Sequence, residues 1–302
     1  MNFENENLDK FIDEKKENIK NQNIKNQNIE DQNIEDLIKT IADAEYVFIG
    51  IGEEWKLSKH FSKVKGQDNK KELYTSDEAG FLREIFEKQF TTQVTNKEGS
   101  PLVIQDAYLN LLNLISSKNY YVISMVNDSY MEQLGFHPEK IVQPCGNQKW
   151  LQCSNGCNDI LYDVDAFNDL LNNYQNLLST ESELEIFAAK QKLPKCEVCG
   201  KELVFNNVEA TRYLEKGYLK NWENYTMWMQ KTLNRKVCML ELGVSLAYPT
   251  VIRWPFEKIA FFNQKSKLFR INGTLFQLSE EIAEKSVSIK QNSVDLFANI
   301  FV

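Results

Sequence analysis

The chain has 302 residues, of which 42% are hydrophobic, so it is long enough for one large domain or for one domain with an inserted lobe. Asp and Glu outnumber Lys and Arg by 43 to 35, which gives a formal net charge of -8 at pH 7. This acidic balance argues against generic nucleic-acid binding, which depends on neutralising phosphates with basic side chains. It still allows a local pocket for a dinucleotide.

The N-terminal residues 1–21 are polar and charged and lack the apolar core of a secretory signal peptide. No run of about 18 apolar residues occurs, so no transmembrane helix and no membrane partner are expected. We therefore predict a cytoplasmic protein. In a reducing compartment, its six cysteines indicate metal binding or chemistry rather than disulfides.

A five-residue repeat occupies residues 18–37 and places Ile19, Ile24, Ile29 and Ile34 at equal intervals. On an α-helix, a step of five residues turns about 140° beyond a full turn, so these isoleucines do not form one stripe. The segment is interpreted as a low-complexity extension, with a docking arm as the alternative. Residues 1–36 are predicted to form this extension, and residues 37–302 the domain.

Hydrophobic patterning then predicts strands alternating with helices. In chain order these are a strand over Glu45–Gly50, helices over Asp77–Gln89 and Gln105–Ser117, a strand over Tyr120–Ser124, helices over Asp163–Lys190 and residues 209–233, strands over Lys236–Gly243, Lys258–Phe262 and Lys267–Asn272, and a closing helix over Leu275–Glu284. This alternation predicts an α/β fold with a mostly parallel, doubly wound sheet. Ligands of such sheets bind at the carboxyl ends of the strands.

Four cysteines form two closely spaced pairs, Cys153 with Cys157 and Cys196 with Cys199, and 38 residues separate the pairs. Gly156 and Gly200 supply the tight turns that wrap an ion. Four thiolates suit tetrahedral Zn²⁺, and a closed shell of four sulfurs leaves no position open for catalysis. We predict a structural zinc site, with two unrelated pairs of buried thiols as the alternative.

Six landmarks occur in an order that resembles the sirtuin family. They are G-I-G after the first strand, N-D after the second, C-G-N eight residues before Cys153, the two cysteine pairs, L-G-V-S after a later strand and I-N after the last. The resemblance covers about residues 40–300 and is greatest to a bacterial branch in which E-L-G-V is followed by P-F-E. It implies a Rossmann-like lobe that binds NAD, with a small zinc lobe inserted at about residues 146–206. It also implies transfer of ADP-ribose from NAD, so the expected partners are NAD or ADP-ribose and a modified protein substrate.

The resemblance assigns cofactor binding to residues at strand ends, namely Gly50, Gly52, Asp128, Gly243, Ser245 and Asn272. Glycine in the first turn lets backbone amides approach a pyrophosphate. Asp128 matches the family aspartate near the nicotinamide, and Asn272 matches an asparagine that contacts a ribose.

The sequence departs from the family at its catalytic positions. Cys145 stands in place of the base histidine, and Val126 replaces an asparagine. A thiol acts as base or nucleophile only as thiolate, so Cys145 is either a replacement catalytic residue or an inert remnant. Glu53 and Glu54 replace a serine-bearing loop. They would repel a pyrophosphate if they faced it, and the alternative is that they face solvent.

Two further features have alternative interpretations. Trp222, Tyr225 and Trp228 lie on the predicted helix over residues 209–233, where a core stripe is favoured over a platform for an acceptor. Arg253 lies beyond the Lys236–Gly243 strand. It either contacts a phosphate or forms an ion pair with a nearby glutamate.

Three functions follow from these observations. The predicted one is a sirtuin-like NAD-dependent transferase, a deacylase or an ADP-ribosyltransferase, with weak or altered catalysis. The second is a non-catalytic sensor or scaffold that binds NAD or ADP-ribose. The third is a zinc-stabilised interaction module whose cleft is blocked by Glu53, Glu54 and Trp55.

Overall fold

The computed structural model describes residues 31–57, 103–167, 169 and 194–301. The chain divides after Asp43 into two compact units. In the first unit, the described residues 31–43 are helical. Most of the repeat, the predicted helix over Asp77–Gln89 and the greater part of the predicted helix over Asp163–Lys190 lie outside the described residues.

A six-stranded parallel sheet forms the framework of the second unit, with strand order β3-β2-β1-β7-β8-β9. Without the strands of a separate small sheet, this is the 3-2-1-4-5-6 order of Rossmann-like folds. The strand order reverses between β1 and β7, so the topological switch point lies there. The predicted α/β fold class is confirmed. The strands are β1 (Tyr46–Ile51), β2 (Asn119–Ser124), β3 (Ile141–Val142), β7 (Val237–Leu242), β8 (Ser266–Ile271) and β9 (Ser286–Ile289).

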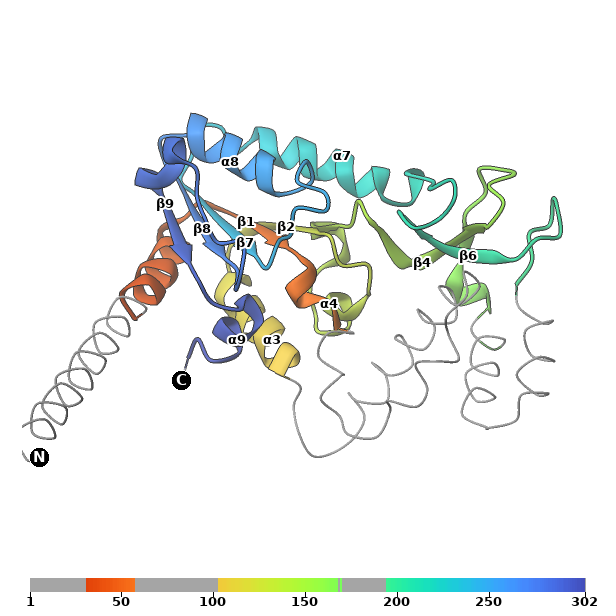
Figure 1. Cartoon of the computed structure of the whole chain (residues 1–302), viewed down its shortest axis with the longest axis horizontal. Coiled ribbons are helices and arrows are strands. Elements are labelled where there is room, and N and C mark those ends of the chain that lie inside the picture. The colour runs from red at the N-terminus through yellow and green to blue at the C-terminus, as the bar shows by residue number, and fades with distance from the viewer. Residues whose placement is uncertain (1–30, 58–102, 168, 170–193, 302) are drawn as a thin grey trace, which may run out of the picture. The chain divides into compact units, whose positions relative to one another are not determined.

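Helices cover both faces of this sheet, with α7 and α8 on one face and α3 and α9 on the other (Figure 1). The central strands are buried along nearly their whole length, as expected for a parallel sheet between two helical layers. Among the described residues, no helix has the length and apolar character needed to cross a membrane. The helices are α3 (Val103–Ile115), α4 (Tyr130–Gln133), α7 (Lys216–Gln230), α8 (Arg253–Phe262) and α9 (Ser293–Ala298).

Aromatic side chains fill the core between the sheet and α7. Phe48 of β1 makes an edge-on contact with Trp228, with ring centroids 4.7 Å apart, and another with Tyr225 at 6.2 Å. Trp222 packs against the same cluster. The prediction that these aromatic residues form a core stripe is confirmed.

The prediction of a strand over Lys258–Phe262 is wrong, because these residues form the second half of α8. Phe256 and Ala260 are buried, whereas Phe261 and Phe262 are exposed. This is the four-residue spacing of a helix face. A short apolar run rich in aromatic residues does not distinguish a strand from a buried helix segment.

The closing helix predicted over Leu275–Glu284 is also largely wrong. Residues 275–279 have no regular structure, and a 3₁₀ turn, η6, spans Glu280–Lys285. The strand β9 and the helix α9, which follow it, were not predicted. A local signal for α9 exists, because Asn292 caps its N-terminus and accepts hydrogen bonds from the backbone of Val294 and Asp295.

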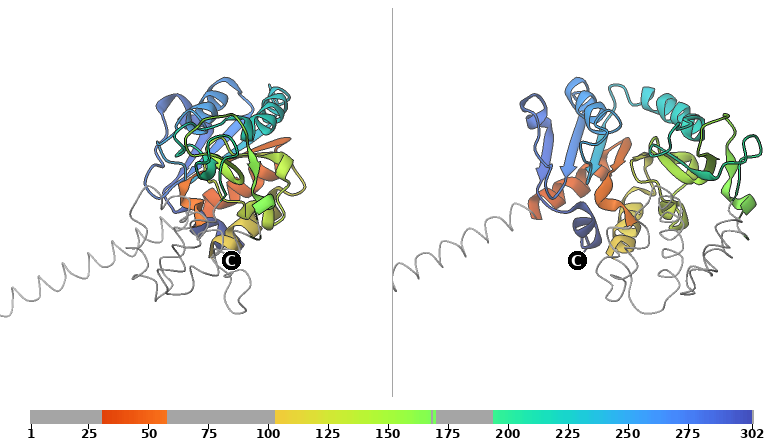
Figure 2. Two further views of the ribbon diagram at one scale, coloured as in Figure 1. Left: turned by 90° about the vertical axis from the view of Figure 1, so that its right-hand side faces the viewer. Right: turned by 45° about the vertical axis from the view of Figure 1, so that its right-hand side comes forward.

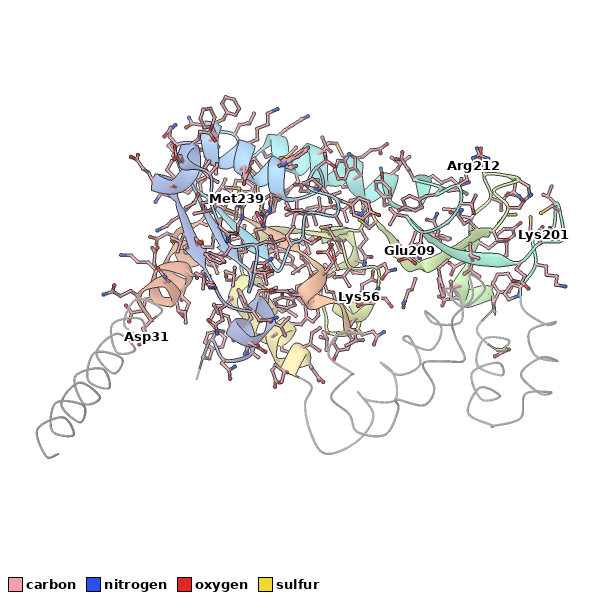
Figure 3. The ribbon with its side chains drawn as sticks, viewed as in Figure 1. Asp31, Lys56, Lys201, Glu209, Arg212 and Met239 are labelled. Atoms are coloured by element: carbon pink, nitrogen blue, oxygen red, sulfur yellow. The ribbon has the colours of Figure 1, made fainter. Side chains whose placement is uncertain are left out.

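A smaller antiparallel sheet, with order β5-β4-β6, is inserted between β3 and α7. Figure 2 shows it at one end of the larger sheet, and α7 extends from the larger sheet to the smaller one, where it contacts β4. Met239 of β7 is fully buried, whereas Lys201 and Arg212 lie at the outer end of the small lobe (Figure 3). The strands are β4 (Gly146–Cys153), β5 (Tyr162–Asp163) and β6 (Leu203–Asn207). Short 3₁₀ turns are η1 (Glu53–Trp55), η4 (Pro138–Lys140) and η5 (Val164–Phe167).

Candidate functional site

Two glycine turns lie pressed together at the switch point. Gly52 directly follows β1, and its N–H donates to the carbonyl of Leu242 at the end of β7 (2.8 Å). A Cβ on Gly52 would lie 2.3 Å from both the carbonyl oxygen of Gly243 and the Cα of Val244. Only glycine fits there, because both obstacles belong to the backbone.

Position 243 also requires glycine, for a reason of backbone conformation. Its φ is +62°, in the left-handed region that side chains disfavour. A Cβ there would also lie 2.3 Å from the Cβ of Glu54. The Glu54 side chain therefore crosses directly over the β7 turn. Gly50, in contrast, lies one residue inside β1, where its missing Cβ makes room for Ile252 beneath α8.

Glu53 and Glu54 turn inward onto the strand ends. The carboxylate of Glu53 accepts hydrogen bonds from the backbone N–H of Ser245 (3.0 Å) and from its hydroxyl (2.6 Å). The carboxylate of Glu54 accepts from the N–H of Gly273 (2.9 Å) and from the N–H and hydroxyl of Ser293 (both 2.7 Å). Both glutamates are half-buried. The interpretation that they face solvent is therefore wrong.

Trp55 anchors this turn in the core. It is fully buried, and its ring contacts Tyr108 of α3 with centroids 4.6 Å apart. Its indole N–H donates to the hydroxyl of Ser293 (2.8 Å), which also donates to Glu54. The E-E-W sequence thus joins the end of β1 to the start of α9.

Asn272, which follows β8, has its polar atoms engaged within the chain. Its Nδ2 donates to the carbonyl of Val244 (3.0 Å), and its Oδ1 accepts from the N–H groups of Thr274 (2.9 Å) and Leu275 (2.8 Å). The side chain is buried and holds the β8 turn against the β7 turn. Its predicted contact with a ribose remains a prediction.

Asp128 lies just beyond the end of β2, and its carboxylate accepts a hydrogen bond from the N–H of Tyr130 (3.2 Å). Burial, and then the charge of Asp128, raise the pKa of the Tyr130 hydroxyl to about 12. Gln143 fixes this segment, because its side-chain amide donates to the carbonyls of Val126 (2.8 Å) and Asp128 (2.9 Å). Sequence reasoning missed Gln143, which carries no local motif.

Cys145 is 5% exposed and lies between β3 and β4. Burial, and then the nearby negative charge of Glu53, raise the pKa of its thiol to about 11. The hydroxyl of Tyr213 donates to the carbonyl of the preceding Pro144 (3.0 Å) and fixes the backbone next to Cys145. At neutral pH the environment therefore favours the protonated thiol, which is a poor base and a poor nucleophile.

Alkylation should measure this effect directly. A thiol with a pKa of about 11 carries roughly a hundredfold less thiolate at pH 8 than one at 9.0. We expect iodoacetamide to modify Cys145 in the folded chain at least a hundredfold more slowly than in urea. The rate should rise about tenfold per pH unit up to pH 10. Peptide mass spectrometry resolves this site from the other cysteines, and a rate that levels off near pH 8 would contradict the assignment.

A buried ionic cluster lies behind the strand ends. Glu241 of β7 is 1% exposed and accepts from Nε and Nη2 of Arg270 on β8 (both 2.9 Å). Arg253 of α8 pairs with the same carboxylate (2.9 Å) and also donates to the carbonyl of Leu275 (2.7 Å). Of the two interpretations of Arg253, the structure shows the ion pair. The cluster holds β7, β8 and α8 in register near the switch point.

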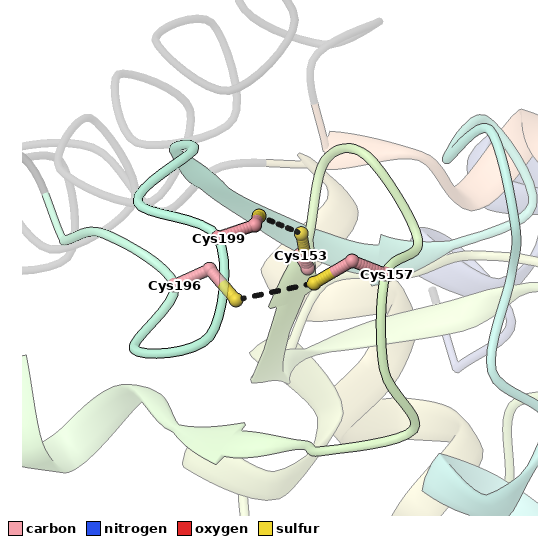
Figure 4. Close-up of side chains that lie close together, drawn as sticks. All are labelled: Cys153, Cys157, Cys196 and Cys199. Atoms are coloured by element: carbon pink, nitrogen blue, oxygen red, sulfur yellow. Dashed lines mark hydrogen bonds between the residues drawn. The ribbon is translucent and has the colours of Figure 1, made fainter.

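The four paired cysteines meet at the tip of the small lobe (Figure 4). Their sulfurs all lie within 4.8 Å of one another, and two contacts are closer, Cys153 with Cys199 (3.5 Å) and Cys157 with Cys196 (3.6 Å). Tetrahedral zinc with bonds of about 2.3 Å places its sulfurs about 3.8 Å apart. The donor set and its spacing therefore fit a zinc ion.

Backbone geometry shapes this cluster before any ion binds. Gly156 and Gly200 have φ values of +58° and +70°, and their N–H groups donate to the carbonyls of Cys153 (2.9 Å) and Cys196 (2.8 Å). The backbone N–H of Cys199 is the main cause that lowers the pKa of the Cys196 thiol to about 6. These turns are the tight ones that the glycine positions predicted.

Asn158 is a second residue that sequence reasoning missed. Its amide lies 3.1 Å from the sulfurs of both Cys157 and Cys196 and donates to them. Donors to coordinating sulfurs orient metal ligands and stabilise their negative charge. The only signal in the sequence is its position directly after Cys157.

No family model matches the chain. It is similar to a Staphylococcus aureus protein described as "Protein ADP-ribosyltransferase", 21% identical over 213 residues, which cover 68% of this chain and 62% of the relative. It is also similar to a Fusarium oxysporum protein described as a "Probable bifunctional ADP-ribose hydrolase/ADP-ribosyltransferase", 27% identical over 146 residues, which cover 45% of this chain and 23% of the relative. The chain thus spans less than two thirds of the length of both relatives.

Two solved structures share the architecture of the chain. One, described as "The Structural basis of Sirtuin Substrate Affinity", has a TM-score of 0.51 at 16% identity and covers 88% of this chain and 97% of its own. The other, "Structural Basis for the Mechanism and Regulation of Sir2 Enzymes", has a TM-score of 0.50 at 15% identity and covers 88% and 95%. The chain therefore has a sirtuin-like fold.

Proposed function

We propose that this chain is an NAD-dependent transferase that moves ADP-ribose from NAD to a protein acceptor. The observation that carries the proposal is the pair of interlocked turns at Gly52 and Gly243, at the switch point of a sirtuin-like fold. Dinucleotides bind at this place in Rossmann-like sheets. Both curated relatives are described as ADP-ribosyltransferases, which favours ADP-ribosyl transfer over deacylation.

In this proposal, the strand ends bind the cofactor and Asp128 lies beside the departing nicotinamide. Bound NAD supplies the ADP-ribosyl group, since the bond between nicotinamide and ribose breaks and the acceptor forms the new bond. Gly50, Gly52, Gly243, Ser245 and Asn272 would shape the cofactor site. With a pKa of about 11, Cys145 stays neutral and provides no general base. The acceptor must then supply a reactive nucleophile of its own, which makes catalysis weaker or more selective.

We also propose that Cys153, Cys157, Cys196 and Cys199 hold a structural zinc ion. Four cysteines would complete its coordination shell. The ion would fix the lobe and take no part in transfer.

Release of nicotinamide from NAD tests the transferase proposal. We expect the chain to release nicotinamide when a protein acceptor is present, and Asp128→Asn to lower the rate at least tenfold. Asp163→Asn is the matched control, because both aspartates accept a backbone N–H two residues later and asparagine preserves that bond. Liquid chromatography of released nicotinamide measures the rate. Equal rates in the two variants would argue against a role for Asp128, and no release with any acceptor would refute the transferase.

The neutral Cys145 and the buried Val126 favour one alternative, a non-catalytic sensor that binds NAD or ADP-ribose. The two functions differ in one measurement. A sensor binds NAD and leaves it intact, whereas the transferase binds NAD and releases nicotinamide. Calorimetry combined with the nicotinamide assay on the same sample separates them.

A further inference from the structure

Segments that follow β7, β8 and β9 present five hydrogen-bond donors to the two glutamates that follow β1. They are the N–H and hydroxyl of Ser245, the N–H of Gly273, and the N–H and hydroxyl of Ser293. Backbone amides and serine hydroxyls gathered in this way are the groups that bind phosphate in nucleotide-binding folds.

The chain satisfies all five donors with its own carboxylates. Glu53 binds both donors of Ser245, and Glu54 binds the other three, at 2.6–3.0 Å. Four of the five lengths are those of charge-assisted hydrogen bonds, and the bond from the N–H of Ser245 is slightly longer at 3.0 Å. The glycine at position 243 leaves the space through which the Glu54 side chain crosses the β7 turn. Hydrogen bonds and the surrounding backbone therefore fix the positions of both acidic side chains.

A carboxylate and a phosphate compete for such donors in two ways. They use the same N–H and O–H groups, and as like charges at short range they repel each other. Half-buried charges are screened less by salt than exposed ones. A phosphate that binds these donors must therefore displace at least one carboxylate.

We propose that Glu53 and Glu54 act as an internal anion that occupies the phosphate position and weakens the binding of dinucleotides. This inference rests on the proposed function, since it concerns the same site. The two residues set how tightly the site holds a pyrophosphate, and Glu53 is the residue at which this effect can be tested. Glu54 also ties the turn to α9, so its replacement affects folding as well as binding.

Calorimetric titration with ADP-ribose tests the inference on the full chain. We expect Glu53→Gln to bind ADP-ribose at least tenfold more tightly than the wild type. Glu53→Ser is a second uncharged variant in case the amide disturbs the turn, and thermal melting checks that both variants fold. Glu223→Gln is the matched control, because it removes the same charge from an exposed position on α7. It should change the affinity less than twofold.

Adenosine separates charge competition from a general opening of the site. It carries no phosphate, so its affinity should change less than twofold between the wild type and Glu53→Gln. An equal gain for adenosine and ADP-ribose would overturn the inference. So would equal binding of ADP-ribose by the wild type and both Glu53 variants, or no binding by any of them.

The outcome is distinguishable from that of the transferase proposal. If Glu53→Gln binds ADP-ribose more tightly but no variant releases nicotinamide, the internal anion stands and the transferase fails. If the wild type releases nicotinamide and binds as tightly as Glu53→Gln, the transferase stands and the internal anion fails.

Discussion

Replacing Cys153 with serine is expected to remove bound zinc from the purified chain and to unfold the small lobe. Cys153 ends β4 and is 1% exposed, so its thiolate would both bind the proposed ion and anchor it to the sheet of the small lobe. Structural zinc contributes roughly 10–16 kcal/mol of apparent binding free energy to small zinc-dependent modules. A sheet of three short strands has little core of its own to replace that contribution.

Elemental analysis should find about one zinc ion per wild-type chain, as expected for a site of four cysteines, and less than a tenth of that in the variant. Limited proteolysis should then cut within residues 146–207 of the variant before it cuts the parallel sheet. Cys238→Ala is the control, because this buried cysteine lies in β7, outside the cluster, and its loss should leave the zinc content unchanged. Full zinc content in Cys153→Ser would refute the metal site.

Replacing Glu241 with alanine is expected to lower the free energy of unfolding by about 3–5 kcal/mol. The substitution leaves Arg270, whose side chain is 1% exposed, without its bidentate partner, and Arg253 without its ion pair. The cost comes mainly from the buried guanidinium of Arg253, which loses its ion pair, and from that of Arg270, which is left with the partly exposed Glu257, rather than from the value of the ion pair itself. Urea unfolding followed by circular dichroism measures the change.

Glu257→Gln is the matched control for this prediction. Glu257 pairs with Arg270 at 2.7 Å, but its side chain is 28% exposed. Water can therefore replace the lost interaction, and we expect a loss of about 1 kcal/mol or less. Equal losses in Glu241→Ala and Glu257→Gln would show that burial does not set the cost. The Glu241 variant should also weaken the binding of ADP-ribose, because Glu241 lies two residues before Gly243.

The zinc pattern and the fold class were predictable from local spacing. Cys153 and Cys157, like Cys196 and Cys199, are close in sequence, and a glycine next to each pair already indicates the turn that brings the sulfurs together. Buried strands such as Tyr46–Ile51 and Val237–Leu242 are recognisable because each is a short, nearly continuous run of apolar residues. Such signals need no knowledge of distant neighbours.

Other features depend on which distant segments meet. The composition of Lys258–Phe262 is compatible with a strand or a helix. In the structure these residues are helical, and Ala260 packs into the core. Arg253 forms its ion pair with Glu241 because β7 places that carboxylate next to α8. The sequence showed two acidic residues after a glycine turn, but their direction was open.

The direction of Glu53 and Glu54 was decided only by the tertiary structure. Glu53 binds Ser245 across 192 residues of sequence, and Glu54 binds Ser293 across 239. These donors meet because parallel strands bring their carboxyl ends to one edge of the sheet. Local spacing determined which four cysteines come together and where the central strands form. The pairing of strands determined which charges face one another, because a hydrogen bond depends on distance in space and not along the chain.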